Sequence, residues 1–253
     1  MSYDLQKADF WKRISAFLFD FIIIGIVIVG VAWGLSAALK FDYYKSNLDA
    51  CYEEYEKEFG IDFGISADDF NALSEEDQAK YTAAAKKMET DTNTYYYYNM
   101  TVNLLLVIVI ISILVGFVAL EFVVPLIFGN GQTLGKKIFG IGVMRCDGVK
   151  ITTFMVFVRS ILGKCTIETL IPVMVFIMII TNLTGLVGII ILFGLPLAQI
   201  ILLFATKART PIHDIMAGTV TVDMASQMIF DTPEQLLEYK TRIAEERANR
   251  AEY

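Results

Sequence analysis

Residues 102–128 read VNLLLVIVIISILVGFVALEFVVPLIF, an apolar run with a single charged residue, Glu121. A helix of about 20 apolar residues crosses the hydrocarbon core of a bilayer, which is roughly 30 Å thick. This run is long enough and apolar enough to cross. It therefore predicts an integral membrane protein.

Two further runs have the same character. Residues 14–39 contain one acid, Asp20, and residues 183–205 contain no charge. The first run is too long for a cleavable signal peptide and has no small-residue cleavage site at its end, so it predicts an anchor that is retained.

Residues 153–181 are ambiguous. Residues 170–180 are fully apolar, whereas the preceding half carries Arg159, Lys164 and Glu168. That half either begins a long crossing helix or lies in the headgroup region as an interfacial helix. Both alternatives give one crossing, and the total is four.

The composition agrees with a membrane protein. Of 253 residues, 55% are hydrophobic and only 19% are charged, with mean hydropathy +0.54, whereas soluble domains are about 25% charged. The net charge of −7 argues against nucleic acid as a partner, because phosphates are repelled. Three cysteines argue against a disulfide scaffold.

Basic residues indicate the orientation, because positively charged short loops stay in the cytoplasm. They flank the runs at three places: Lys7, Lys12 and Arg13; Lys136, Lys137, Arg145 and Lys150; and Lys207 with Arg209. We therefore expect a multi-pass plasma-membrane protein with both termini in the cytoplasm. Residues 40–99 and a short turn at 182–185 are then outside.

The predicted outer segment, 40–99, holds fourteen acids and six lysines, a local charge of −8. Its apolar spacing predicts that the first helix continues beyond the bilayer as far as Gly60 and Gly64. Ser74-Glu75-Glu76-Asp77 resembles a capping box that opens a second helix, through Lys87 or as far as Tyr98. We expect an acidic helical hairpin with a solvated surface.

Two cytoplasmic elements are also predicted. Asp147-Gly148 lies between the β-prone runs 138–145 and 149–153, which is typical of a β-hairpin. Thr232-Pro233 opens a charged surface helix that ends near residue 252.

The expected fold class is an all-α polytopic membrane protein: a four-helix transmembrane bundle with a cytoplasmic β-hairpin and an extracytoplasmic helical hairpin. Its segments are 1–39 (N-terminus and first crossing), 40–99 (outer hairpin), 100–128 (second crossing), 129–153 (loop with the β-hairpin), 154–182 (amphipathic segment and third crossing), 183–206 (fourth crossing) and 207–253 (cytoplasmic tail).

Several charges fall inside these crossings. Asp20 lies about 9 Å from the cytoplasmic end of its run and Glu121 about 10 Å, so they reach a similar level. A charge in lipid costs about 2.5–3.5 kcal/mol even on mild scales, so such groups should turn inward and pair. We expect a cluster of Arg13, Asp20, Glu121, Arg159 and Glu168, which is either an ion-paired network that fixes packing or an ion or proton site with one unpaired acid.

Other site classes are disfavoured. Residues 131–137 resemble a phosphate loop, but Asn130 and Lys137 stand where that loop requires Gly and Ser or Thr. One histidine and no acid cluster at ligand spacing argue against a zinc site. No nucleophile motif is present, so we expect neither an enzyme nor a cofactor.

An ordered set of motifs resembles the RDD family of bacterial membrane proteins over residues 8–223. The parts are Arg13 to Ala16 followed by Asp20; Glu121; Gly131, Thr133, Gly135 and Lys136, with Gly148 after Asp147; Arg159 with Glu168 and Pro172; and His213, Asp214, Ala217, Gly218 and Thr219. This sequence departs from the family pattern at Ser160, Lys164 and Glu168.

The resemblance implies, at most, a sodium–proton type of transport, because some members have been proposed as antiporters. In that case Asp20 and Glu121 share a site for a small cation or protons, Arg13 or Arg159 tunes their proton affinity, and Asp214 closes the site with one of these arginines. A homo-oligomer is expected, because four helices leave little room for a path. The alternative is a non-transporting scaffold that recruits a partner through the outer hairpin or the tail.

Overall fold

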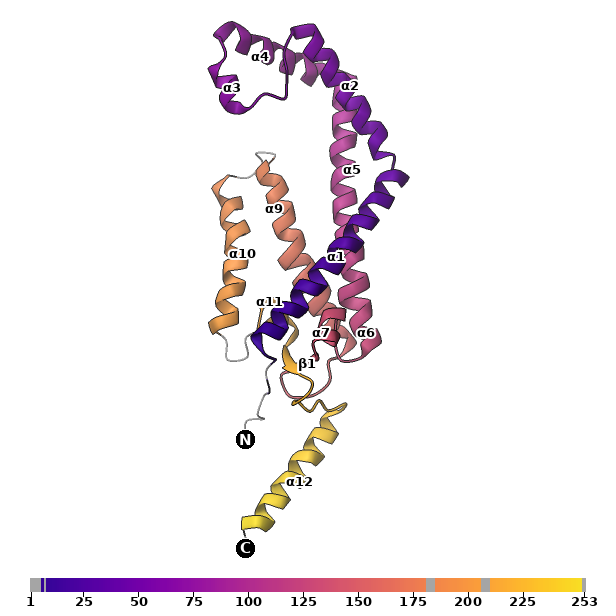
Figure 1. Ribbon diagram of the computed structural model, residues 1–253, viewed down its shortest axis with the longest axis vertical. Helices are drawn as coiled ribbons and strands as arrows, with labels where there is room; N and C mark the ends of the chain where they lie inside the picture. The colour runs from indigo at the N-terminus through magenta and orange to yellow at the C-terminus, as the bar shows by residue number, and fades with distance from the viewer. Residues whose placement is uncertain (1–5, 7, 181–184, 206–209, 252–253) are drawn as a thin grey trace. The chain divides into compact units, whose positions relative to one another are not determined.

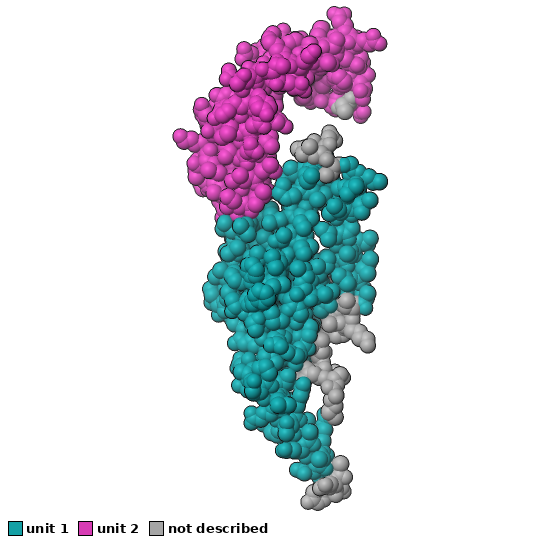
Figure 2. Space-filling model, turned by 180° about the vertical axis from the view of Figure 1, so that it is seen from behind, with its two compact units in different colours: residues 1–28, 113–253 teal, residues 29–112 magenta. Residues whose placement is uncertain are grey.

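The computed structural model describes Gln6 and residues 8–180, 185–205 and 210–251 (Figure 1). Most of the predicted outer turn at 182–185, and the orienting charges Lys7, Lys207 and Arg209, lie outside the described residues. The chain falls into two compact units, residues 1–28 with 113–253 and residues 29–112 (Figure 2).

Three helical stretches of the described chain are long and apolar enough to cross a membrane. The first is α1 (Phe10–Ala38). The second runs without interruption from Thr92 to Phe128 through α5 (Thr92–Phe117), the π-helical segment η1 (Val118–Val123) and α6 (Val124–Phe128). The third runs from Thr153 to Ile179.

The third stretch comprises α8 (Thr153–Phe157), the π-helical segment η2 (Val158–Leu170) and α9 (Ile171–Ile180). The Thr152 hydroxyl caps it by accepting from the Met155 N–H. Of the two alternatives for this segment, the continuous helix fits the long crossing.

The last apolar helix, α10 (Leu186–Ala205), contains Pro196 and lies beside α9 (Figure 1). Its apolar part, Leu186–Leu202, is shorter than the three other stretches. Four crossings therefore remain a prediction, with three supported by helix length.

The unit of residues 29–112 contains the predicted helical hairpin, with α2 (Phe41–Phe59), α3 (Ala67–Ala72) and α4 (Glu75–Thr90). The first membrane helix does not continue into it as predicted: α1 ends at Ala38, and Lys40 adopts a left-handed conformation with φ 56° before α2 begins. Gly60 ends α2, as predicted, with φ 64°.

The predicted Ser74 cap forms at the start of α4. The Ser74 hydroxyl accepts from the Asp77 N–H and donates to its carboxylate. Helix α4 ends at Thr90, between the two predicted ends, because Asp91 accepts from the Thr94 N–H and begins α5. The short helix α3 was not predicted.

The predicted β-hairpin forms only in part. A tight turn forms at Asp147-Gly148, where the Arg145 N–H donates to the Val149 carbonyl and Met144 and Lys150 make an antiparallel bridge. The longer partner of β1 (Ile141–Arg145) is the distant β2 (Thr219–Asp223), which pairs with it antiparallel. The chain after the turn also bonds to Phe230, whose carbonyl accepts from the Lys150 N–H.

This small sheet forms the core of its unit. Ile141, Val143, Met144, Val220 and Val222 are all almost fully buried. Two short helices precede its strands: α7 (Leu134–Ile138), capped by the Thr133 hydroxyl, and α11 (Ile212–Ala217), ended by the left-handed Gly218.

The predicted tail helix is α12 (Pro233–Ala251). Most of it is exposed, as expected, but Leu236 is buried against Val149 and Phe230.

The contact between η2 and α11 is close enough to test. A Cβ added at Gly163 would lie 2.6 Å from the Cβ of His213 and 2.8 Å from its Cα. We expect Gly163→Ala to lower the free energy of unfolding by about 1–3 kcal/mol, because overpacking forces the backbones apart. Thermal unfolding in detergent measures this. Gly194→Ala in α10, where nothing lies within 4 Å, is the control; equal stability of both variants would refute the close packing.

Candidate functional site

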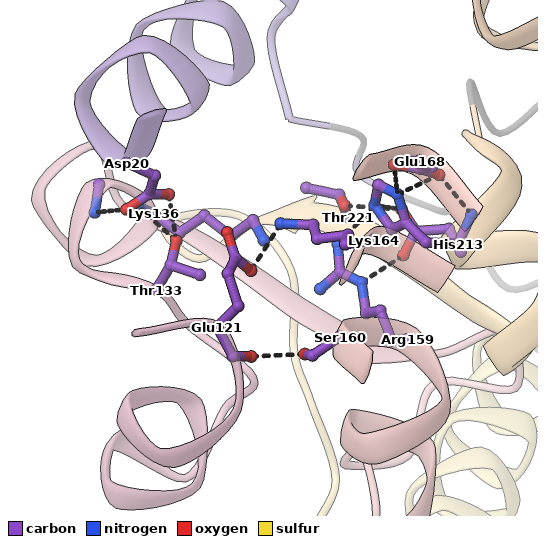
Figure 3. Close-up of polar contacts among 12 residues, drawn as sticks. Asp20, Glu121, Thr133, Lys136, Arg159, Ser160, Lys164, Glu168, His213 and Thr221 are labelled. Atoms are coloured by element: carbon purple, nitrogen blue, oxygen red, sulfur yellow. Dashed lines mark hydrogen bonds and ion pairs between the residues drawn. The ribbon is translucent and has the colours of Figure 1, made fainter. Parts of the chain in front are cut away.

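A buried group of charged and polar side chains occupies the unit of residues 1–28 and 113–253 (Figure 3). Asp20, on α1, is one end of it. Its carboxylate accepts hydrogen bonds from the Thr133 hydroxyl and from the Gly135 N–H, the latter at 2.7 Å. A side chain at 135 would clash, since an added Cβ would lie 2.3 Å from the Ala16 carbonyl oxygen. Glycine therefore lets α7 approach α1 closely enough to hold Asp20.

Glu121, on η1, is held by η2. Its carboxylate lies 2.6 Å from Lys164 Nζ, and its backbone carbonyl accepts from the Ser160 hydroxyl. Glu121 is only 4% exposed. An ionised carboxylate is costly in an apolar environment, and Lys164 supplies the positive charge that balances it.

Arg159 and Asp214 form the most deeply buried pair. Arg159 Nε lies 2.8 Å from Asp214 Oδ1, and the two side chains are 5% and 0% exposed. The Thr219 and Thr221 hydroxyls also donate to Asp214. Burial alone would raise the pKa of Asp214, but the Arg159 charge and these contacts outweigh it and keep the pKa below its ordinary value.

His213 bridges Glu168 and Arg159. Its Nδ1 lies 2.9 Å from Glu168 Oε1, and its Nε2 lies 3.4 Å from Arg159 Nη2. Burial lowers the pKa of His213 despite its acidic neighbours, so a neutral ring is favoured at neutral pH. A neutral ring with the proton on Nδ1 satisfies both contacts, donating to the carboxylate and accepting from the guanidinium.

The π-helical segment η2 explains how one helix forms ion pairs with both Asp214 and Glu121. Arg159 and Lys164 are five residues apart, which in an α-helix of about 3.6 residues per turn would place them on different sides. Hydrogen bonds in a π-helix join residues five apart, so both cations face the cluster. Thr166 and Thr169 follow the same spacing, their hydroxyls donating to the carbonyls of Ile161 and Lys164.

Lys136 differs from the other charged groups. Its Nζ is buried and has no hydrogen-bond partner among the described residues. Burial, together with the positive charges of Arg159 and Lys164, holds the pKa of this amino group well below its ordinary value, while Glu121 and Asp20 act in the opposite direction. This amino group can therefore exchange a proton without breaking a hydrogen bond to any described residue.

Asp214 and Arg159 are almost fully buried, whereas Lys164 and Glu168 are partly exposed, at 15% and 19% of their side chains. A crevice lined by Glu121, Arg159, Ser160 and the apolar side chains of Pro125, Ile151 and Val156 is too narrow to hold a water molecule. Of the described residues, no three His, Cys, Asp or Glu side chains are grouped so as to hold a metal ion.

A family model, the RDD family, matches residues 7–218. The chain belongs to the RDD family. No curated protein and no solved structure matches it. The match covers most of the chain and confirms the resemblance drawn from the motifs.

The RDD motif residues bring the predicted charges into one cluster. Asp20, Glu121, Arg159, Glu168 and Asp214 all belong to it, and Asp214 pairs with Arg159, one of its two predicted partners. Arg13, the remaining member of the predicted cluster, is half-buried, and Asp20 is held by Thr133 and Gly135.

The remaining RDD motif residues shape the backbone around this cluster. Gly131, Gly148 and Gly218 have φ values of 60°, 96° and 62°, which favour glycine. Ala217 is buried, and Thr219 donates to Asp214. Pro172 lies in the first turn of α9.

Sequence reasoning missed three features of the site. Lys164 was noted as a charge of the ambiguous segment and as a departure from the family pattern, but not as the ion-pair partner of Glu121. Thr221 was not singled out, although its alternation with Thr219 along a strand could have indicated a shared face. Gln199 lies in the uncharged run 183–205, and nothing in the local sequence distinguishes it. Its side-chain oxygen accepts a hydrogen bond from the Ile212 N–H.

The two buried lysines should respond differently to removal. Lys164→Met leaves Glu121 without its counter-charge and should lower the free energy of unfolding by about 3–5 kcal/mol. Lys136→Met removes an amine that has no hydrogen bond and should leave stability unchanged or raise it. Melting temperatures in detergent test this; the reverse order would show that Lys136, not Lys164, carries the essential pair.

Proposed function

We propose that this RDD-family membrane protein exchanges a small cation of the sodium type for protons, with Lys136 as the proton carrier and Asp20 and Glu121 as the carboxylates. The buried amino group of Lys136, without a hydrogen-bond partner among the described residues, is the observation that carries the proposal. Both acids act on this amine electrostatically.

The charge of the cluster supports competition between the two ions. Four acids, Asp20, Glu121, Glu168 and Asp214, face two paired cations, Arg159 and Lys164. With Lys136 and His213 neutral, the sum is 2 − 4 = −2. One added positive charge is therefore favourable, either a proton on Lys136 or a metal cation beside the carboxylates. A protonated Lys136 and a metal cation would both interact with Asp20 and Glu121, so we expect the two ions to compete for these carboxylates.

This proposal revises the site expected from sequence. The expected proton carrier was an unpaired acid, whereas every acid of the cluster has a partner. Asp20 accepts hydrogen bonds from Thr133 and Gly135, and we assign its carboxylate the further role of coordinating a cation. Exchange requires a second conformation in which water reaches Lys136.

We propose further that the chain acts as a homo-oligomer in the plasma membrane, with four crossings and both termini in the cytoplasm. The basic flanks of the apolar runs support this orientation. No catalytic activity is proposed.

Sodium-driven proton flux in proteoliposomes tests the exchange. Lys136→Met should reduce it at least about tenfold, because the proton carrier is lost; Asp20→Asn should weaken the apparent sodium affinity at least about tenfold, because one carboxylate is lost. Lys137→Met is the matched control, since Lys137 is exposed and lies over the Phe128 ring. Full flux in Lys136→Met would exclude this mechanism.

A non-transporting scaffold is the second candidate. Pairing of every acid in the cluster and the absence of a water-sized space in the described crevice favour it. In that function the cluster only fixes the helices, and the exposed end of α12 recruits a partner.

Truncation after Lys240 separates the two functions. It removes the exposed end of α12 but keeps Leu236 and Tyr239, which pack on Val149 and Phe230. Under the exchange proposal, proton flux in proteoliposomes stays at the wild-type level. Loss of a cellular phenotype with this truncation, with no flux in the wild type, would support the scaffold.

A further inference from the structure

A cavity of about 560 Å³ lies within the unit of residues 29–112 and shares no residue with the ionic cluster. Four aromatic side chains line it: Tyr52 of α2, Phe63 after α2, and Tyr95 and Tyr98 of α5. The volume falls within the range of roughly 300–1,000 Å³ that small-molecule sites have.

The charged group that lines the cavity is negative. Of the described residues that line the cavity, Glu89 is the one with a formal charge, and none is a lysine, arginine or histidine. Among the described residues Glu89 forms no ion pair, whereas four lysines of this unit pair with other acids. Thr94, the lining hydroxyl on the buried side, donates to Asp91 at 2.5 Å. The cavity thus offers aromatic faces and one carboxylate.

An ammonium group already uses this combination elsewhere in the same unit. Lys87 Nζ lies 5.7 Å from the ring centroids of both Tyr55 and Phe59 and pairs with Glu58. Aromatic faces attract cations through the ring quadrupole, most effectively cations that are weakly hydrated. The cavity offers the same two kinds of group, aromatic rings and a carboxylate, and it is open to the surface at Glu89, Tyr95 and Tyr98, which are exposed.

We propose that this aromatic cavity binds a free organic cation of the methylated-ammonium class, with the rings of Tyr52, Phe63, Tyr95 and Tyr98 around the head group and Glu89 as its counter-charge. An anion is disfavoured by the fourteen acids and six lysines of residues 40–99. Burial and nearby Tyr98 and Asp49 raise the pKa of Tyr52, so its phenol stays neutral and Glu89 carries the lining charge. This site is independent of the proposed ion exchange.

Titration calorimetry of the full-length protein in detergent tests the cation requirement. The two probes are choline and its uncharged isostere 3,3-dimethyl-1-butanol, which have the same shape. Choline should bind saturably and at least about tenfold more tightly, because only the charge distinguishes the two. Equal affinity, or no choline binding, would overturn the proposal, the former in favour of a neutral apolar ligand.

Substitutions inside and outside the cavity test where choline binds. Glu89→Gln should weaken choline binding about threefold to tenfold, as should Tyr95→Ala, which alters an exposed side chain and spares the fold. Glu53→Gln makes the same charge change on α2 outside the cavity and should leave affinity unchanged. Unchanged affinity in both cavity variants would place choline elsewhere and refute the site.

Lipid is the competing source of an ammonium head group. Choline affinity should be the same in nanodiscs of phosphatidylglycerol, which has no amine, as in detergent. If phosphatidylethanolamine nanodiscs abolish choline binding, the cavity takes a lipid head group, and the assignment to a free cation is wrong.

Discussion

An ionised side chain without a partner in an apolar environment costs several kcal/mol, and this constraint organises the body of the protein. Asp20, Glu121, Arg159 and Asp214 come from α1, η1, η2 and α11, and each is buried. Asp20 ties α1 to α7, Glu121 ties η1 to η2, and Arg159 ties η2 to α11. The small sheet continues the network, because Thr219 and Thr221 of β2 donate to Asp214. The π-helical geometry of η2 allows one helix to present Arg159 and Lys164 together.

The same network sets the conditions for any ion chemistry. A cluster in which all acids are paired holds its helices firmly, whereas an exchange site needs one group whose protonation can change at low cost. Lys136 meets that need, because it is buried near Asp20 and Glu121 and makes no hydrogen bond within the described residues. Packing and proton exchange are thus assigned to different members of one cluster: Arg159 and Lys164 hold the helices, and Lys136 responds to the proton.

Sequence predicted the parts of the fold that follow from local chemistry. The apolar runs, the Ser74 cap and the tail helix at Pro233 depend on neighbouring residues, and all appear. Contacts between residues far apart in the chain were not predicted. The turn at Asp147-Gly148 was recognised, but the strand before it pairs mainly with Thr219–Asp223, and no local sequence pattern connects these two strands. The bend at Lys40 was missed because lysine does not mark a left-handed position. The depth of each acid along its helix predicted that Asp20 and Glu121 belong to one cluster. The ion pair between Lys164 and Glu121 could not be predicted in this way, because it depends on the π-helical spacing of η2.

The central claim is that burial and the neighbouring cations hold the pKa of the Lys136 amino group well below its ordinary value. Solution NMR of the full-length protein with ¹⁵N-labelled lysine, assigned by Lys136→Met, measures the pKa of this amino group directly. The account predicts a pKa far below the ordinary value of about 10.4, with exposed Lys137 as the internal reference. A Lys136 amino group that stays protonated up to the ordinary lysine pKa would contradict it.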